Sequence, residues 1–322
     1  MRHSVRYLIL VLTFAIAAFT ARAQNLGYEG PTGIFIEPTA YTSASPANGL
    51  GMPSIGFHFL AGGPVLGDFS TASITEGFAK RFEVGLTGEY HAGGDHFDDS
   101  TRASNLSAMF TSDFNIVHGK AIMVGETKCL PSIAVGGIYR FSDHVNQDMY
   151  NWYYDARPDI FQKVTSTDVY VVATKTLTQV IPTVPVLFSA GIRGTNASLW
   201  GIGGASPVFQ GRGFGALAFE IPGPAKSTIT PAIEVAQQPN HSLMGTEIAS
   251  EPGASMKEEV GFGDIPTSEA YSVRIVPSPK LKLNVDAGVL HAAGIVYIGN
   301  ARGRVYDYDA RARMFFGISY GF

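Results

Sequence analysis

Segments in which apolar and polar side chains alternate recur along the chain from residue 54 to its last residue. In residues 82–91 the even positions are Phe, Val, Leu, Gly and Tyr, and the odd positions are Glu, Gly, Thr, Glu and His. Because successive side chains of a strand point to opposite faces, such a segment forms a strand with one apolar and one polar face. A tilted strand of roughly 9–11 residues crosses the hydrocarbon of a membrane. The pattern therefore predicts an all-β, antiparallel transmembrane barrel.

The alternating segments predict about 12 strands, with 10 to 14 left open. Barrels of the bacterial outer membrane join their strands by short periplasmic turns and longer external loops. Most of the expected links follow this rhythm if both termini lie in the periplasm, but the link 115–130 is long where a short turn is expected. The expected strands are residues 54–61, 69–79, 82–91, 103–114, 131–142, 167–177, 185–195, 212–221, 228–237, 269–276, 280–290 and 312–322.

The N-terminus predicts export. Basic residues precede an apolar run from Tyr7 to Phe19, and Ala21-Arg22-Ala23 has the small residues that a signal peptidase requires. We therefore expect residues 1–23 to be a cleaved signal peptide, with localisation in the bacterial outer membrane. Residues 24–52 are irregular and rich in Pro, Gly, Ser and Thr, so they are expected to be a plug, an extra strand or a periplasmic tether. The barrel itself is expected to span residues 53–322.

Composition excludes several other classes of protein. Only 16% of the residues are charged, and no later stretch has 18 consecutive apolar residues, so a bundle of membrane helices is excluded. The net charge of -4 is too small to indicate nucleic acid as a partner. Cys129 is the only cysteine, so no internal disulfide can form and closure of the sheet must supply stability.

Two parts of the sequence resemble known families. Residues 30–40, Gly-Pro-Thr-Gly-Ile-Phe-Ile-Glu-Pro-Thr-Ala, resemble the opening of outer-membrane barrels associated with exopolysaccharide export. The stretches 130–136, 168–175, 193–197 and 320–322 resemble a proteobacterial outer-membrane family that is classified only as a domain of unknown function. These resemblances imply the fold and the location. They imply no activity, and no catalytic residue of either family is matched.

The last strand resembles a targeting signal as well. Tyr320 and Phe322 end an alternating segment, and a terminal Tyr-x-Phe is similar to the signal read by the outer-membrane assembly machinery. The expected partners are therefore this machinery, periplasmic chaperones and outer-membrane lipid. A small solute or a polysaccharide is the ligand class that such a barrel would handle.

Nine charged residues lie on the polar faces of the expected strands and would point into the lumen. Five are acidic and four are basic, which indicates either cross-lumen ion pairs that fill a narrow barrel or a water-filled pore of mixed charge. These candidate lumen-facing residues are Glu83, Glu89, Arg140, Arg193, Glu220, Glu234, Arg274, Lys282 and Asp286.

No catalytic site, cofactor or metal is predicted. His91, Asp95 and their neighbours are expected to be solvated loop charges because their spacing fits no calcium or zinc motif. No Gly-x-Ser-x-Gly sequence is present. The leading functional hypothesis is a passive channel or uptake route for small solutes. The alternatives are a non-conducting accessory protein of envelope or exopolysaccharide assembly and, less favoured, an outer-membrane hydrolase; we expect the protein not to be an enzyme.

Overall fold

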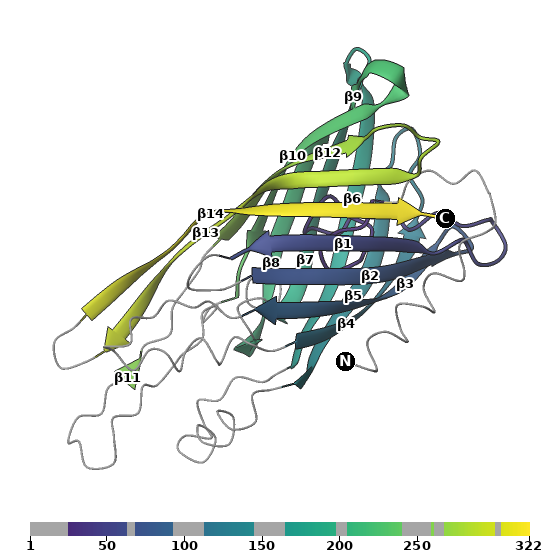
Figure 1. Cartoon of the computed structure of the whole chain (residues 1–322). Coiled ribbons are helices and arrows are strands. Elements are labelled where there is room, and N and C mark those ends of the chain that lie inside the picture. The colour runs from purple at the N-terminus through teal and green to yellow at the C-terminus, as the bar shows by residue number, and fades with distance from the viewer. Residues whose placement is uncertain are drawn as a thin grey trace, which may run out of the picture.

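The chain forms one closed antiparallel β-barrel of twelve long strands (Figure 1). The computed structural model describes residues 25–62, 68–92, 113–144, 165–197, 205–239, 259–260, 267–299 and 304–322. Consecutive strands pair with one another, and β14 pairs with both β13 and β1, which closes the sheet. No helix among these residues is long and apolar enough to cross a membrane.

Twelve strands form the wall, and two short ones pair with it at its ends. The wall strands are β1 (Ser54–Ala61), β2 (Asp68–Phe78), β3 (Phe82–Ala92), β4 (Asp113–Val124), β5 (Ser132–His144), β6 (Thr165–Ile181), β7 (Val184–Ala197), β8 (Ala205–Phe219), β10 (Thr228–Gln237), β12 (Thr267–Val276), β13 (Leu283–Gly299) and β14 (Arg304–Gly321). The short strands are β9 (Ile221–Pro222) and β11 (Glu259–Val260), which pair with β10 and β13.

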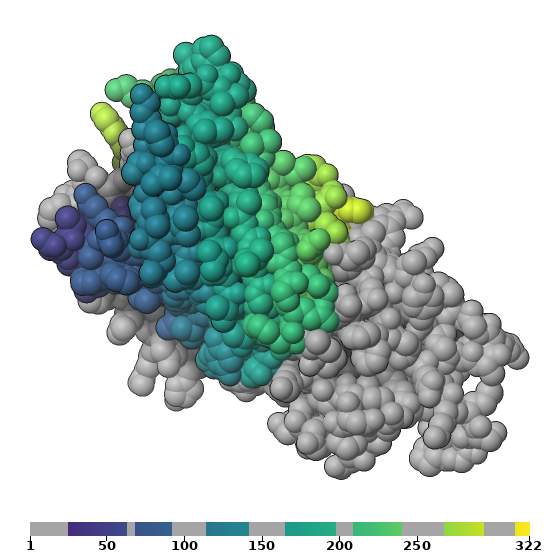
Figure 2. All heavy atoms as spheres, turned by 180° about the vertical axis from the view of Figure 1, so that it is seen from behind, coloured from purple at the N-terminus to yellow at the C-terminus, as the bar shows by residue number. Residues whose placement is uncertain are grey.

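The alternation read from the sequence separates the outside of the barrel from its lumen. On β3, Val84 is 62% exposed and Tyr90 is 60% exposed, whereas Glu83 on the opposite face of the same strand is buried. Figure 2 shows the outer surface over β4 to β10. Val117, Phe188 and Ile192 are among the exposed apolar side chains of these strands. An apolar exterior around a polar interior is the arrangement of an outer-membrane barrel, because the outer face meets lipid.

Strand β4 corrects the sequence-based assignment. The expected strand 103–114 begins outside the described residues, and the structure places the strand at Asp113–Val124. The alternation is weak there because the lumen face mixes Ile116 with His118 and Lys120, while the outer face includes small residues. With this strand in place, the turn 125–131 is short, and the rhythm of short and long links is restored.

The short connections gather at one end of the barrel, which we call the short-turn end. They join β2 to β3, β4 to β5, β6 to β7, β8 to β10 and β12 to β13, and the C-terminus lies at the same end (Figure 1). Phe322 accordingly donates its N–H to the carbonyl of Pro53 just before β1, at 3.2 Å. Tyr320 pairs with Ile55 and Leu283 in the seam that closes the barrel. Recognition of Tyr320 and Phe322 by an assembly machinery stays a prediction.

Candidate functional site

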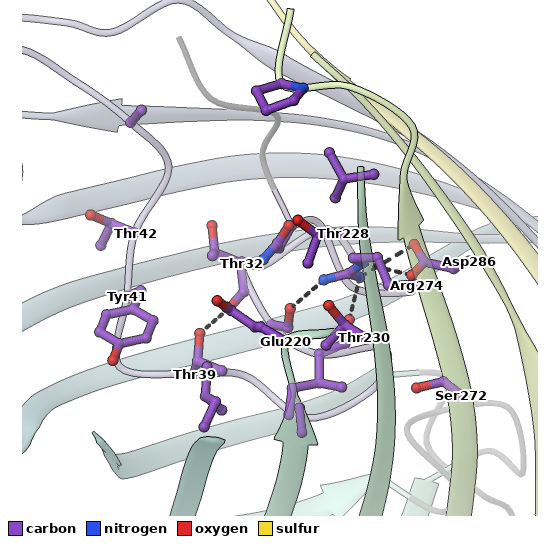
Figure 3. Close-up of a pocket in the computed structure, with 18 residues that line it drawn as sticks. Thr32, Thr39, Tyr41, Thr42, Glu220, Thr228, Thr230, Ser272, Arg274 and Asp286 are labelled. Atoms are coloured by element: carbon purple, nitrogen blue, oxygen red, sulfur yellow. Dashed lines mark hydrogen bonds and ion pairs between the residues drawn. The ribbon is translucent and has the colours of Figure 1, made fainter. Parts of the chain in front are cut away.

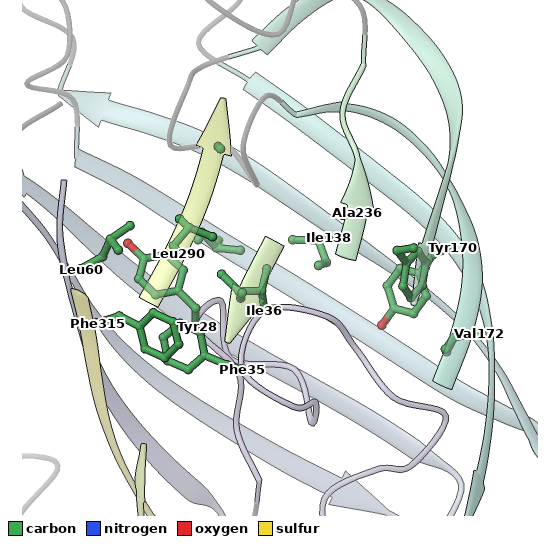
Figure 4. Packing of buried hydrophobic residues seen from close by; sticks show 14 of the residues in the cluster. Tyr28, Phe35, Ile36, Leu60, Ile138, Tyr170, Val172, Ala236, Leu290 and Phe315 are labelled. Atoms are coloured by element: carbon green, nitrogen blue, oxygen red, sulfur yellow. The ribbon is translucent and has the colours of Figure 1, made fainter. Parts of the chain in front are cut away.

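The lumen is occupied by the chain's own N-terminal region. Residues 25–43, which we call the plug segment, precede β1, and Leu26, Tyr28 and Ala40 are fully buried within the barrel. Figure 4 shows Tyr28, Phe35 and Ile36 of this segment between inward side chains of the wall, including Leu60 and Phe315. Of the three roles expected for residues 24–52, the one that matches this position is a plug.

The plug segment enters and leaves the barrel at the short-turn end. At its start, the side chains of Asn25 and Asn284 are joined by a hydrogen bond of 3.2 Å, close to the beginning of β13. Residues 44–52 lead out again, and Gly51 donates its N–H to the carbonyl of Gly77 near the end of β2, at 2.8 Å. The segment is therefore a re-entrant loop with both ends on one side.

Two tight turns shape the plug segment. The first is closed by the N–H of Gly27, which donates to the carbonyl of Pro31 at 2.8 Å. Gly30 in this turn has φ +99°, a region that side-chain-bearing residues rarely adopt. A Cβ at Gly30 would also lie 2.5 Å from Oγ1 of Thr87 on the wall. The stretch 30–40, singled out by its resemblance, thus forms the centre of the plug.

Glu234 on β10 holds the second turn of the plug by its backbone. Its carboxylate accepts hydrogen bonds from three consecutive N–H groups, those of Phe35 and Ile36 at 2.9 Å and that of Glu37 at 2.6 Å. Three converging amides form a small anion-binding concavity, which compensates a buried negative charge. Glu234 is 2% exposed, so this carboxylate serves the plug and does not face an open pore.

Glu83 and Lys120 clamp the plug from β3 and β4. Glu83 accepts hydrogen bonds from the N–H of Thr32 at 2.9 Å, from the hydroxyl of Thr32 and from the N–H of Ser43 at 2.7 Å. The ammonium of Lys120 lies 3.3 Å from the same carboxylate. It also donates to the carbonyls of Thr32 and Thr39, at 2.8 and 3.1 Å. The acid thus binds plug donors and the base binds plug acceptors.

Two arginines pair with carboxylates that the plug carries into the lumen. Arg140 on β5 makes a bidentate contact with Glu29, with Nη2 2.7 Å from Oε2, and also lies 2.8 Å from Asp168 of β6. Arg193 on β7 pairs with Glu37 of the plug. A buried arginine without a carboxylate is strongly destabilising, so these pairs match charge across the plug and the wall.

Arg274 on β12 binds the plug by its carbonyl groups. It donates to the carbonyls of Gly33, at 3.2 Å, and Ile34. Asp286 on β13 lies 2.6 Å from its Nε and balances its charge within the wall. Arg274 and Asp286 occupy opposite positions in the pairing of β12 with β13, which sets this geometry.

Seven of the nine predicted lumen-facing charges are buried inside the barrel, and two are not. Glu220 follows β8 and is half-buried at the short-turn end. Lys282 lies in the turn before β13, with φ +52°, because that strand begins at Leu283 and not at residue 280. The prediction that Lys282 faces the lumen from a strand is therefore corrected. The seven that are buried are Glu83, Glu89, Arg140, Arg193, Glu234, Arg274 and Asp286.

Among the described residues, sequence reasoning missed two buried wall charges, Lys120 and Asp168, and two buried acids of the plug segment, Glu29 and Glu37. Lys120 was placed in a link because β4 was assigned too early. Asp168 lies two residues before Tyr170 and therefore on the same face of β6, and this face points inward. Asp95 of the loop cluster lies outside the described residues, and His91 stacks on Phe69 at a ring distance of 4.0 Å. In the part of the chain that the structure describes, no group of three or more His, Cys, Asp or Glu residues is arranged to hold a metal ion.

A cavity of about 690 Å³ separates the plug segment from the wall formed by β8, β10, β12 and β13 (Figure 3). Thr39, Tyr41 and Thr42 line it on the plug side. On the wall side it is lined by Glu220, Thr228, Thr230, Ser272, Arg274 and Asp286, among others.

Tyr41 fixes the end of the plug segment to two neighbouring strands. Its hydroxyl donates to Glu126 in the β4–β5 turn at 2.5 Å and lies 2.8 Å from the hydroxyl of Thr176 on β6. Lys175 lies 3.2 Å from the same carboxylate. Partial burial favours the neutral acid, but the hydrogen bonds from Tyr41, Thr176 and Lys175 prevail and lower the pKa of Glu126.

The similarity of the chain to known proteins is distant. No protein-family model matches the chain, and no curated protein matches it. Among solved structures, the KdgM porin is 11% identical, with 84% of this chain and 99% of that chain covered and a TM-score of 0.44. KdgM porin in complex with disordered oligogalacturonate is 10% identical over 84% of this chain and 99% of that chain, with a TM-score of 0.43. LpxR from Salmonella typhimurium is 8% identical, with 84% of this chain and 100% of that chain covered and a TM-score of 0.42.

These similarities are too distant to transfer a function to this chain. The closed sheet, its apolar outside and its polar inside make the chain an outer-membrane type of β-barrel.

Proposed function

We propose that the protein is a plugged outer-membrane barrel that conducts no ions in its resting state and acts as an accessory protein of envelope or exopolysaccharide assembly. The observation that carries the closed resting state is the pairing of the inward charges with the plug segment. Glu83, Arg140, Arg193, Glu234 and Arg274 all bind its backbone or its carboxylates. In an open pore these side chains would be solvated or paired across water. The accessory role is supported by the resemblance of residues 30–40 to barrels associated with exopolysaccharide export.

The chemistry of the contacts supports a plug that stays in place. Removing one partner of a buried charged pair costs about 3–5 kcal/mol, because the other charge remains without compensation. Displacing the plug would uncover such groups on β3, β5, β7, β10 and β12 together. Water entering the lumen would repay part of this cost. Even so, an open state reached by thermal motion alone would be rare.

The passive-channel hypothesis is the second candidate, and the cavity beside the plug favours it. A space of about 690 Å³ gives a small solute a place to enter from the short-turn end. For such a solute to pass through the barrel, the plug segment would have to move. A conducting form would therefore be a gated one.

Conductance of the refolded protein in planar bilayers tests the proposal. The intact chain should give no steady openings, whereas a variant lacking residues 25–43 should open a pore through the same wall. Heat-modifiable gel mobility and β-rich circular dichroism would show that both forms are folded. Steady openings of the intact chain would refute the resting-state closure and favour the channel hypothesis.

The accessory role needs its own test in the cell. Deleting the gene should reduce exported polysaccharide or alter the envelope, and expressing the intact chain should restore it. An unchanged envelope would count against this role even if the barrel is silent in bilayers. The expectation that the protein is not an enzyme stays a prediction, which assays of lipid and peptide hydrolysis by the purified protein would check.

A further inference from the structure

The cavity beside the plug segment has the size and the position of a ligand site. Its volume of about 690 Å³ lies within the range of roughly 300–1,000 Å³ that is typical of small-molecule pockets. It lies near the short-turn end, because Glu220, Thr228 and Pro279 in its lining are next to the short connections. One wall is the plug and the other is the inner face of the barrel (Figure 3).

Hydroxyl groups without a protein partner face this cavity. Among the described residues, the hydroxyls of Thr42, Thr228, Thr230 and Ser272 make no hydrogen bond to the protein, although all four residues line the space. Thr230 lies opposite Arg274 in the pairing of β10 with β12. By contrast, the wall threonines that touch the plug are used; the hydroxyl of Thr75, for example, donates to the carbonyl of Gly30 at 2.8 Å.

The hydroxyls lie on both sides of the cavity. Thr42 belongs to the plug segment, and Thr228, Thr230 and Ser272 belong to β10 and β12. Each hydroxyl can donate one hydrogen bond and accept others. A ligand between the two walls would therefore need many groups that both donate and accept, which is the property of a polyhydroxylated molecule.

The charges of the lining indicate an uncharged ligand. Arg274 is the one basic residue in the lining, and it is paired with Asp286 and with plug carbonyls. Glu220 adds a second carboxylate, so the lining carries one positive and two negative charges. An anionic ligand would meet like charge and no free cation, which opposes its binding.

Tyr41 offers a fixed aromatic surface at the same site. Its hydroxyl is held by Glu126 and Thr176, so the ring has little freedom to turn away. Tyr41 lies in the lining of the cavity (Figure 3). The aliphatic faces of sugar rings pack well on aromatic rings, while their hydroxyls remain free to bond at the edges. A rigid ring loses little conformational entropy when a ligand binds.

From these observations we propose that the cavity binds a neutral oligosaccharide of two or three sugar rings, taken up from the short-turn side while the plug remains in place. This inference rests on the proposed function, because it names the ligand class of a barrel whose lumen stays closed. The free hydroxyls of β10, β12 and the plug hold the ligand, and the ring of Tyr41 supports it.

Calorimetric titration of the full-length protein in detergent tests the proposal. Neutral trisaccharides with different linkages, maltotriose, cellotriose and chitotriose, are the probes, with trigalacturonate as the anionic counterpart. At least one neutral probe should bind at concentrations up to about 10 mM, and the anion should bind more weakly. The double variant Thr230→Val with Ser272→Ala should weaken that binding about tenfold, because it removes two hydrogen-bonding groups.

Two further variants provide a control outside the cavity and a block within it. Thr178→Val, at an exposed position of the β6–β7 hairpin, is the matched control and should bind like the unmodified protein. Ala44→Trp places a large side chain at an exposed position of the lining and should abolish binding without disturbing the core.

The outcomes separate this inference from the proposed function. The inference would be overturned if no neutral probe bound, if the anion bound more tightly, or if the double variant bound as the unmodified protein does. None of these results would contradict a barrel that conducts no ions. If the protein bound sugar but also conducted ions steadily, the closed resting state would be refuted and the sugar-binding site would be supported.

Discussion

Glu234→Ala is the substitution that most directly tests how the plug is held. The change removes the carboxylate that accepts three N–H groups, those of Phe35, Ile36 and Glu37, at 2.6 to 2.9 Å. A buried donor left without an acceptor costs about 1–3 kcal/mol, so three such donors cost about 3–9 kcal/mol. Water can enter the space that the side chain vacates, and we therefore take the lower limit, about 3 kcal/mol.

Hydrogen exchange measures this loss at the affected atoms. Because about 1.4 kcal/mol corresponds to a factor of ten, the amides of Phe35, Ile36 and Glu37 should exchange about 100-fold faster in the variant. The strand amides of the wall should change little. Brief openings should also appear in planar bilayers, since the plug would leave the lumen more often.

Glu76→Ala is the matched control, because Glu76 is near the short-turn end of β2 on the face shared by Ile74 and Phe78, away from the lumen. Glu234→Gln should fall between the two, since an amide keeps one acceptor oxygen but loses the charge. If Glu234→Ala left the exchange of the three amides as slow as in the unmodified protein, the assignment of Glu234 as an anchor of the plug would be wrong.

Three further predictions concern the turns and the plug. Gly30→Ala combines a φ of +99° with a Cβ 2.5 Å from Thr87 Oγ1, so it should raise the susceptibility of the N-terminal segment to protease, and an unchanged cleavage rate would contradict this. Ala79→Asn with Lys80→Gly should stabilise the barrel by about 1 kcal/mol in urea titrations, because both positions have positive φ in the β2–β3 turn. The tie of Tyr41 to Glu126 is present above the ordinary pKa of a glutamate and is lost as pH falls through the lowered pKa, so Glu126→Gln should flatten the loss of stability in acid; a slope as steep as before would argue against it.

The sequence predicts the wall of the barrel well because a membrane strand is specified by local alternation. Strand β10 was predicted at residues 228–237 and is found there. Strand β4 was predicted too early because Ile116 on its lumen face and Gly119 on its outer face weaken the contrast on which the prediction depends. The long links between strands have no pattern that fixes where a strand ends. The last two strands were predicted at residues 280–290 and 312–322, but β13 extends to Gly299 and β14 begins at Arg304.

The site was predictable only in part, because its contacts join residues far apart in the chain. The alternation of apolar and polar residues predicts that Glu83 and Glu234 face the lumen. It could not show that their partners are backbone amides of the plug segment. A backbone donor looks the same at every position of a sequence. The irregular composition of residues 24–52 left three roles open, and a choice among them depends on the width of the lumen, which emerges only when β14 pairs with β1.

The position of the plug segment before β1 imposes an order on biogenesis. The plug segment is synthesised before the wall, yet Thr32 is 51 residues from Glu83, and Leu26 is 248 residues from Arg274. Until β12 is in place, Arg274 cannot bind the plug segment, and the plug segment lacks part of its set of partners. Contacts of such long range form slowly. Closure of the seam and docking of the plug segment are thus expected to be coupled late steps, and a barrel arrested before them would expose its inward charges without their partners.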